Sequence, residues 1–343
     1  MEIRSFSADD ADMIASVVDL TNAATEVDAP FRHPETVRSY TGALRYGWDL
    51  ETPETHAAWD DDGSLVGVLT LETSEWDNTH LVWAGITVHP DKRRRGHGTA
   101  LLEFALGRAK EVSRRSIGID GWDTPVARGF AAKHGLLRKS SAINRRQRLA
   151  AIDPSVLATM YDEATAAASG YELLRLVGRT PDDLLEAVAE VSASINDAPT
   201  DDLDIEDEMF SPERIANYET AQLEGGKRLY RVVARHTESG DLAGHSVVVV
   251  EDERPAFGEQ HDTSVHRSHR GEGLASLLLE EAVKYAVSKG ARAIEGYPVD
   301  HAHRDRWDTS GAYVGTVEMF RRCGFDEVGR RKPARPLMRR SRS

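Results

Sequence analysis

The chain has almost no cysteine, since Cys323 is the only one among its 343 residues. A single thiol cannot close a disulfide within the chain, and it cannot build a zinc site that needs several cysteines. Cys323 is expected on the apolar side of a helix, as a packing residue rather than a nucleophile. The pair His301 and His303 lacks an identifiable third ligand, so no metal is expected.

Long apolar runs are also missing. No stretch approaches the length that spans a bilayer, and residues 1–6 lack the apolar core of a signal peptide. We therefore expect a cytoplasmic protein without a membrane partner.

Positive charge is scarce. Lys and Arg number 43 against 57 Asp and Glu, and the formal net charge is −14. This balance argues against broad binding to nucleic acids or anionic membranes, although a local basic patch could still hold an anionic cofactor. A nucleic-acid function would rest only on the basic tail, residues 330–342, and is disfavoured.

The chain is longer than one typical domain. It has 343 residues, so two domains are expected. The composition, 40% hydrophobic and 29% charged, is that of a globular protein. The sequence is compatible with either a monomer or a homodimer.

A strand, a glycine turn and a helix follow one another in the first half. The alternating apolar run Leu81–Val88 leads into Arg93-Arg94-Arg95-Gly96-His97-Gly98, and residues 100–106 repeat apolar side chains with helical spacing. A turn without side chains lets several backbone N–H groups point at one phosphate, and the dipole of the following helix favours negative charge there. The pattern predicts an anion site.

A second copy of this pattern begins at Thr263 and contains Arg270-Gly271-Glu272-Gly273. The order of the expected elements around it also repeats, as strand, two helices, strands, glycine loop, helix, strand, helix and strand. We therefore predict an α/β (α+β) protein made of two copies of one unit. The predicted parts are an N-terminal domain at residues 1–152, a linker helix at 153–170 and a C-terminal domain at 171–343.

Both halves resemble the GNAT acetyltransferase superfamily, which transfers an acyl group from acyl-coenzyme A to an amine. Residues 93–98 fulfil its pattern Gln/Arg-x-x-Gly-x-Gly/Ala. In the second half we align Gly271 and Gly273 with the two glycines of the first copy, which puts Ser268 at the Gln/Arg position and shortens the loop by two residues. The resemblance implies two tandem GNAT folds, each a mixed, mostly antiparallel sheet flanked by helices.

The resemblance also implies that each turn binds the pyrophosphate of acetyl-coenzyme A, and that the preceding strand hydrogen-bonds the pantetheine arm. In the first half the expected cofactor contacts are Ile86, Val88, Arg93, Arg94, Arg95, Gly96, His97, Gly98, Thr99 and Ala100. In the second half they are Thr263, Val265, Arg270, Gly271, Glu272, Gly273, Leu274 and Ala275.

Acylation of an amine needs a base, because an alkylamine with a pKa of about 10.4 is protonated at neutral pH. In many GNAT enzymes a carboxylate six residues before the cofactor-lining valine serves as this base. The count reaches Glu259 in the second half but Val82 in the first, so we expect the chemistry in the C-terminal domain. The N-terminal domain then either binds the cofactor without turnover or supports the fold. Alternation along the strand would put Glu259 and His261 on the face of Thr263 and Val265. Both could equally be solvated edge-strand residues.

The acid for the departing thiolate is less defined. The family's tyrosine falls at Phe320, which has no hydroxyl. Tyr313 is the nearest substitute and Tyr297 is another, and the alternative for Tyr313 is a packing role.

The predicted function is an N-acetyltransferase acting on an amine of a small molecule or peptide. The acidic run 201–208 could attract a cationic acceptor or be a solvated charge run. A non-catalytic acyl-coenzyme A-binding regulator or scaffold is the alternative function.

Overall fold

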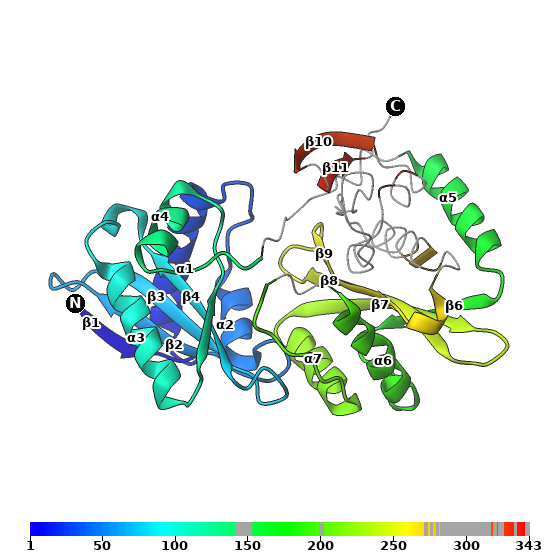
Figure 1. The fold of residues 1–343 in the computed structure, drawn as a ribbon, viewed down its shortest axis with the longest axis horizontal. Helices are drawn as coiled ribbons and strands as arrows, with labels where there is room; N and C mark the ends of the chain where they lie inside the picture. The colour runs from blue at the N-terminus through cyan, green and yellow to red at the C-terminus, as the bar shows by residue number, and fades with distance from the viewer. Residues whose placement is uncertain are drawn as a thin grey trace. The chain divides into compact units, whose positions relative to one another are not determined.

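The computed structural model describes residues 1–140, 153–198 and 202–270, positions 274, 277, 278, 281, 317 and 321, and the strands at 326–332 and 335–339. Contacts divide the chain into two units (Figure 1). Unit 1 comprises residues 1–140, 202–209 and 224–226, and unit 2 comprises residues 141–201, 210–223 and 227–343. The predicted domain boundary at residue 152 lies outside the described residues.

Unit 1 is built on a five-stranded sheet with the strands in chain order. The strands are β1 (Glu2–Ser5), β2 (Glu54–Trp59), β3 (Leu65–Glu72), β4 (Leu81–Val88) and β5 (Ser116–Ile119). All neighbours are antiparallel except β4 and β5, which run parallel. The prediction of a mixed, mostly antiparallel sheet is therefore confirmed.

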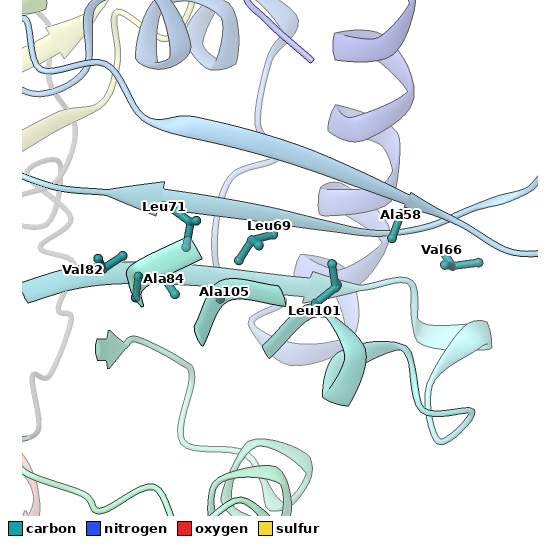
Figure 2. Close-up of a cluster of buried hydrophobic side chains, with 9 residues drawn as sticks. Ala58, Val66, Leu69, Leu71, Val82, Ala84, Leu101 and Ala105 are labelled. Atoms are coloured by element: carbon teal, nitrogen blue, oxygen red, sulfur yellow. The ribbon is translucent and has the colours of Figure 1, made fainter. Parts of the chain in front are cut away.

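Helices cover both faces of this sheet. They are α1 (Ala11–Asp28), α2 (Val37–Tyr46), the 3-10 turn η1 (Pro90–Lys92), α3 (His97–Glu111) and α4 (Pro125–Lys133). Figure 2 shows Leu101 and Ala105 of α3 among the buried side chains of the strands, including Leu69 and Val82. On the opposite face Val17 and Leu20 of α1 pack against Val68. The apolar spacing of each helix thus selects the face that it covers.

Strands β4 and β5 separate at one end of the sheet. They pair over four positions only, from Leu81 opposite Ser116 to Ala84 opposite Ile119. Strand β4 continues to Val88, and residues 85–88 pair with β3 alone. The other edge of residues 85–88 therefore faces no strand among the described residues. Its backbone groups are available to a ligand, apart from the Val88 carbonyl, which accepts from Arg93 Nε.

Unit 2 repeats this arrangement with an antiparallel four-stranded sheet. Its strands are β6 (Tyr171–Val177), β7 (Lys227–His236), β8 (Leu242–Glu251) and β9 (Gly258–Val265), and a separate hairpin joins β10 (Asp326–Lys332) and β11 (Arg335–Arg339). The helical elements are α5 (Pro154–Ala167), η3 (Asp182–Leu184), α6 (Leu185–Ser192), η4 (Ala193–Asp197), α7 (Pro212–Glu224) and η5 (Arg267–His269). Ala164 and Ala168, at the end of α5, pack against Val232 and Ala234 of the sheet, so the expected linker helix belongs to the core of unit 2.

Two expected elements differ from the sequence prediction. The sequence from Pro181 to about Ile195 predicts one helix, but only Leu185–Ser192 is α-helical. Ser192 Oγ donates to the carbonyl of Val188, and the following Ser, Asn and Asp residues favour turns. The basic sequence from Leu136 to Leu149 predicts a hairpin of two strands. The structure shows no strand at residues 136–140, and the rest of this segment lies outside the described residues.

Candidate functional site

The first glycine turn leaves a row of backbone N–H groups at the start of α3. The chain takes left-handed conformations at Arg94, with φ 66°, and at Gly96, with φ 97°, before α3 begins at His97. Gly96 offers no side-chain cap, and the first bond into the helix runs from Ala100 N to Gly96 O. Among the described residues, no backbone carbonyl accepts from the amides of residues 94–99. These unbonded amides and the helix dipole are the features from which the sequence predicts an anion site.

Side chains around this turn have separate roles. His97 is buried and points away, with Nδ1 3.3 Å from Met1 Sδ, so only its backbone can meet a phosphate. Thr99 Oγ1 lies 3.1 Å from Lys133 Nζ and 3.0 Å from His134 Nε2 at the end of α4. Sequence reasoning missed Lys133 and His134, because α4 meets α3 only in the folded chain.

Small residues allow close packing here. A Cβ atom on Gly98 would lie 3.2 Å from Cε2 of Phe130, and a Cβ on Gly67 would lie 2.9 Å from Leu101 Cδ1. Ile86 and Val88 direct their side chains toward the core under α3. Their backbone, on the open edge of β4, is what remains for the pantetheine contact expected from the sequence.

The described residues around the second glycine motif match those around the first, in a different register from the one expected. Arg270 Nε donates to the carbonyl of Val265 at 3.1 Å, as Arg93 Nε donates to Val88 at 3.1 Å. A Cβ on Gly244 would meet Leu278, as one on Gly67 meets Leu101. Arg270 therefore corresponds to Arg93.

This register corrects the alignment on the glycines. Arg270, not Ser268, stands at the Gln/Arg position, and both loops have the same length. Gly273 and Ala275 then match Gly96 and Gly98, so the second copy also fulfils the pattern. The extra glycine at position 271 misled the alignment. Gly271, Glu272, Gly273 and Ala275 lie outside the described residues, and Leu274, which matches His97, is buried.

A bulge in β9 sets the direction of the candidate base. Val247 pairs with Asp262 while Val248 pairs with Gln260, so His261 is the extra residue between them. Glu259 consequently lies on the face of Asp262, opposite to that of Thr263 and Val265. The predicted shared face is wrong, because strict alternation does not continue through a bulge.

Acid–base side chains gather on the face of the sheet that α7 covers. Tyr218 Oη of α7 lies 2.7 Å from His261 Nδ1, and His261 Nε2 lies 3.9 Å from Glu259 Oε2. His245 Nε2 lies 2.6 Å from Asp262 Oδ2 on the same face. The structure thus brings Glu259 and His261 together and adds Tyr218, which no local pattern marked. Tyr313 and Tyr297 lie outside the described residues.

Burial sets the protonation of this cluster. It lowers the pKa of His261 to about 4, with Lys227 acting in the same direction and Asp262 against it. Burial also raises the pKa of Tyr218. At neutral pH the imidazole is therefore neutral and the phenol protonated. The Glu259 side chain is 62% exposed, so an incoming acceptor can reach it.

Unit 1 carries a different set at the matching place. Val82 is buried in the core beneath α3 and has no proton-accepting atom. Trp83 takes the register position of Glu259, opposite Glu72 on β3. Burial, assisted by Asp120, raises the pKa of Glu72. Unit 1 therefore lacks the pair of Glu259 and His261.

The acidic run belongs to unit 1. Glu206 N donates to Asn78 Oδ1 at 2.7 Å, Met209 N donates to Asp77 Oδ2 at 2.9 Å, and His80 Nε2 lies 3.0 Å from the carbonyl of Asp204. Residues 202–209 are thus held through their backbone by the segment between β3 and β4.

The described residues show neither a group of three metal-ligating side chains nor a helix long and apolar enough to cross a membrane.

Known proteins agree with this architecture. The sequence profile described as the acetyltransferase (GNAT) family matches residues 18–136 and 197–325. The mycothiol acetyltransferase of Stackebrandtia nassauensis is 30% identical over 149 residues, which are 42% of this chain and 46% of that protein. The mycothiol acetyltransferase of Parafrankia sp. is 32% identical over 141 residues, which are 41% of each protein. The aligned stretches thus span less than half of these relatives.

Solved structures share the whole fold. A tandem GNAT protein from the clavulanic acid biosynthesis pathway superposes with a TM-score of 0.67 at 22% identity, over 98% of this chain and 96% of that one. A GCN5-related N-acetyltransferase from Sphaerobacter thermophilus gives a TM-score of 0.57 at 16% identity, over 98% and 94%. With two profile matches, two glycine turns and a two-unit fold, the chain belongs to the acetyltransferase (GNAT) family.

Proposed function

We propose that this protein is an N-acetyltransferase that moves an acetyl group from acetyl-coenzyme A to an amine of a small molecule, or of a peptide. The observation that carries the proposal is the uncapped start of α3, whose amides at residues 94–99 lie at the end of the half-open strand β4. A diphosphate fits the amides and a pantetheine amide chain fits the strand edge. Relatives named mycothiol acetyltransferase support a small-molecule acceptor.

Acetyl-coenzyme A supplies an activated acyl group when it is bound. In unit 1 the amides of residues 94–99 would hold its diphosphate, and Lys133 beside Thr99 adds a positive charge. In unit 2 the matching segment runs from Gly271 to Ser276. Two cofactor molecules per chain are the expected content.

The chemistry is assigned to unit 2. Glu259, exposed on β9, takes the proton from the acceptor ammonium, directly or through water, and leaves a neutral nucleophile. The hydrogen bond with Tyr218 Oη, at 2.7 Å, holds the imidazole of His261 beside this carboxylate. Because the imidazole is neutral, it adds no second positive charge. In unit 1 the open strand edge at residues 85–88 can bind the cofactor, but no counterpart of Glu259 and His261 lies beside it. Unit 1 therefore binds acetyl-coenzyme A without transferring its acetyl group.

A thiol-release assay over a panel of amines, combined with calorimetry, tests this assignment. Glu259→Gln is expected to lower kcat about a hundredfold or more, as loss of a general base does, while the Kd for acetyl-coenzyme A stays unchanged. Glu238→Gln, in the exposed turn between β7 and β8, is the matched control and should behave like the unmutated protein. Equal losses of kcat and affinity, or no loss, would remove Glu259 from the role of base.

A non-catalytic acyl-coenzyme A-binding regulator or scaffold is the second candidate. It is favoured by Phe320 at the family's tyrosine position and by Val82 in the core of unit 1. Tight binding of acetyl-coenzyme A without turnover of any amine would support it. Cytoplasmic residence and a monomeric or homodimeric state stay predictions, and analytical ultracentrifugation measures the latter.

A further inference from the structure

The arginine that opens each glycine turn is held by an aspartate from a distant helix. In unit 1, Nη1 and Nη2 of Arg93 lie 2.8 and 2.7 Å from the two carboxylate oxygens of Asp28, the last residue of α1. In unit 2, Nη2 of Arg270 lies 2.6 Å from Asp197, the last residue of η4. The two units make the same contact between residues that are 65 and 73 positions apart.

This contact engages the guanidinium on two sides. An arginine has five N–H donors. In unit 1 the carbonyl of Val88 receives one from Nε, and Asp28 receives one from each Nη. The carboxylate balances the positive charge at hydrogen-bond distance. Arg93 therefore joins the end of β4 to the end of α1, and it is not a free counterion for a phosphate.

Partial burial makes this pair stronger than an ordinary surface pair. The side chains of Arg93 and Asp28 are 17% and 25% exposed. In unit 2 a second arginine, Arg267, bonds the other oxygen of Asp197, and the two arginines lower the pKa of that carboxyl, Arg267 more than Arg270. The pair of Arg93 and Asp28 is thus partly shielded from water, and Asp197 is held by two arginines instead.

We propose that Asp28 and Asp197 are positioning residues for the two cofactor turns, each fixing the arginine that starts its turn. The proposal rests on the proposed binding of acetyl-coenzyme A. In unit 1 the backbone enters a left-handed conformation directly after Arg93, at Arg94, and again at Gly96. Such a conformation is unfavourable for a residue with a side chain, so both ends of the turn need anchoring. Helix α3 anchors one end, and Asp28 anchors the other through Arg93.

The test is calorimetric titration of the full chain with acetyl-coenzyme A. Asp28→Asn keeps the shape but removes the charge, and it is expected to weaken the site of unit 1 about tenfold or more while the site of unit 2 is unchanged. Asp197→Asn should weaken only the site of unit 2. Asp9→Asn, which breaks an exposed pair with Arg45 in unit 1, is the control and should leave both affinities unchanged.

A double variant separates positioning from a general loss of stability. Glutamine at position 93 can donate to the Val88 carbonyl without a carboxylate partner. In the Arg93→Gln background, Asp28→Asn should therefore cost little further affinity. Unchanged affinity in both single variants, or full additivity in the double variant, overturns the proposal while the proposed function stands. Absence of binding by the unmutated chain overturns the proposed function and this proposal with it.

Discussion

At the scale of single residues, backbone conformation decides which glycine matters. Gly96 has φ 97°, and a Cβ added there would meet no atom within 4 Å. Its requirement is therefore conformational rather than steric. Gly107, within α3, also has open space around its Cβ position but an ordinary helical backbone. The two positions separate the effect of φ from the effect of added volume.

We expect opposite effects of alanine at these two positions. Gly96→Ala should lower the free energy of unfolding of unit 1 by about 1–2 kcal/mol, because a side chain disfavours positive φ. It should also weaken acetyl-coenzyme A binding. Gly107→Ala should raise stability by about 0.5–1 kcal/mol and leave binding unchanged. Urea denaturation and calorimetry measure both. Equal effects at the two positions would mean that φ is not the constraint.

The buried imidazole of His261 gives unit 2 a pH-dependent stability. Its pKa is about 4 in the folded protein, below the ordinary value of 6.5, so unfolding takes up a proton between these two pH values. The contribution of the neutral imidazole to the free energy of unfolding should therefore be fully present above pH 6.5. Between pH 6.5 and pH 4 the free energy of unfolding should fall by up to about 1.4 kcal/mol for each pH unit of acidification. Urea denaturation of the unmutated protein and of His261→Gln at pH 7 and pH 5 measures this. The variant should lose less stability, and equal losses would contradict the assignment.

At the scale of elements, the start of α3 serves both helix stability and ligand binding. A carboxylate in a first helical turn stabilises the helix by about 0.3–1 kcal/mol. The same charge would repel a bound phosphate. A helix whose first turn holds no acidic side chain, as in α3, keeps the site open to anions.

Thr99→Glu should separate these two effects. We expect unchanged or higher thermal stability, because the new carboxylate faces the helix dipole and Lys133. Acetyl-coenzyme A binding to unit 1 should weaken at least tenfold by charge repulsion. Gly107→Glu adds the same charge far along the helix and serves as the control. Weakened binding in both variants would indicate a nonspecific charge effect.

At the scale of the whole molecule, the units do not coincide with continuous halves of the sequence. Residues 202–209 belong to unit 1, where Asn78 and His80 hold their backbone. A fragment that ends at residue 152 therefore lacks part of unit 1.

We expect the isolated fragment 1–152 to unfold at a lower temperature than unit 1 in the full chain. The loss of the 202–209 segment exposes His80, which is buried in the full chain, and removes its hydrogen bonds. Differential scanning calorimetry of the fragment and of the full chain measures the difference in unfolding temperature. Fluorescence of the five tryptophans of unit 1 provides a second measurement. Addition of a 202–209 peptide should restore part of it, whereas identical transitions would show that the segment is not needed.

Local patterns in the sequence predicted the family, the tandem fold and the first glycine turn correctly. Apolar spacing at residues 100–106 predicted a helix, which is α3, and the glycine motif predicted the turn that precedes it. These features depend on residues that are neighbours in the chain, so spacing alone specifies them. The alignment of the second turn was wrong because Gly271 imitates the motif two positions early.

Tertiary structure decided the rest. The match between Arg270 and Arg93 follows from their bonds to Val265 and Val88, and the direction of Glu259 follows from the bulge at His261. Pairing register depends on the neighbouring strand, which a single strand's sequence does not contain. The aspartates that hold the two turns lie on other helices, so only the folded chain brings them to their arginines.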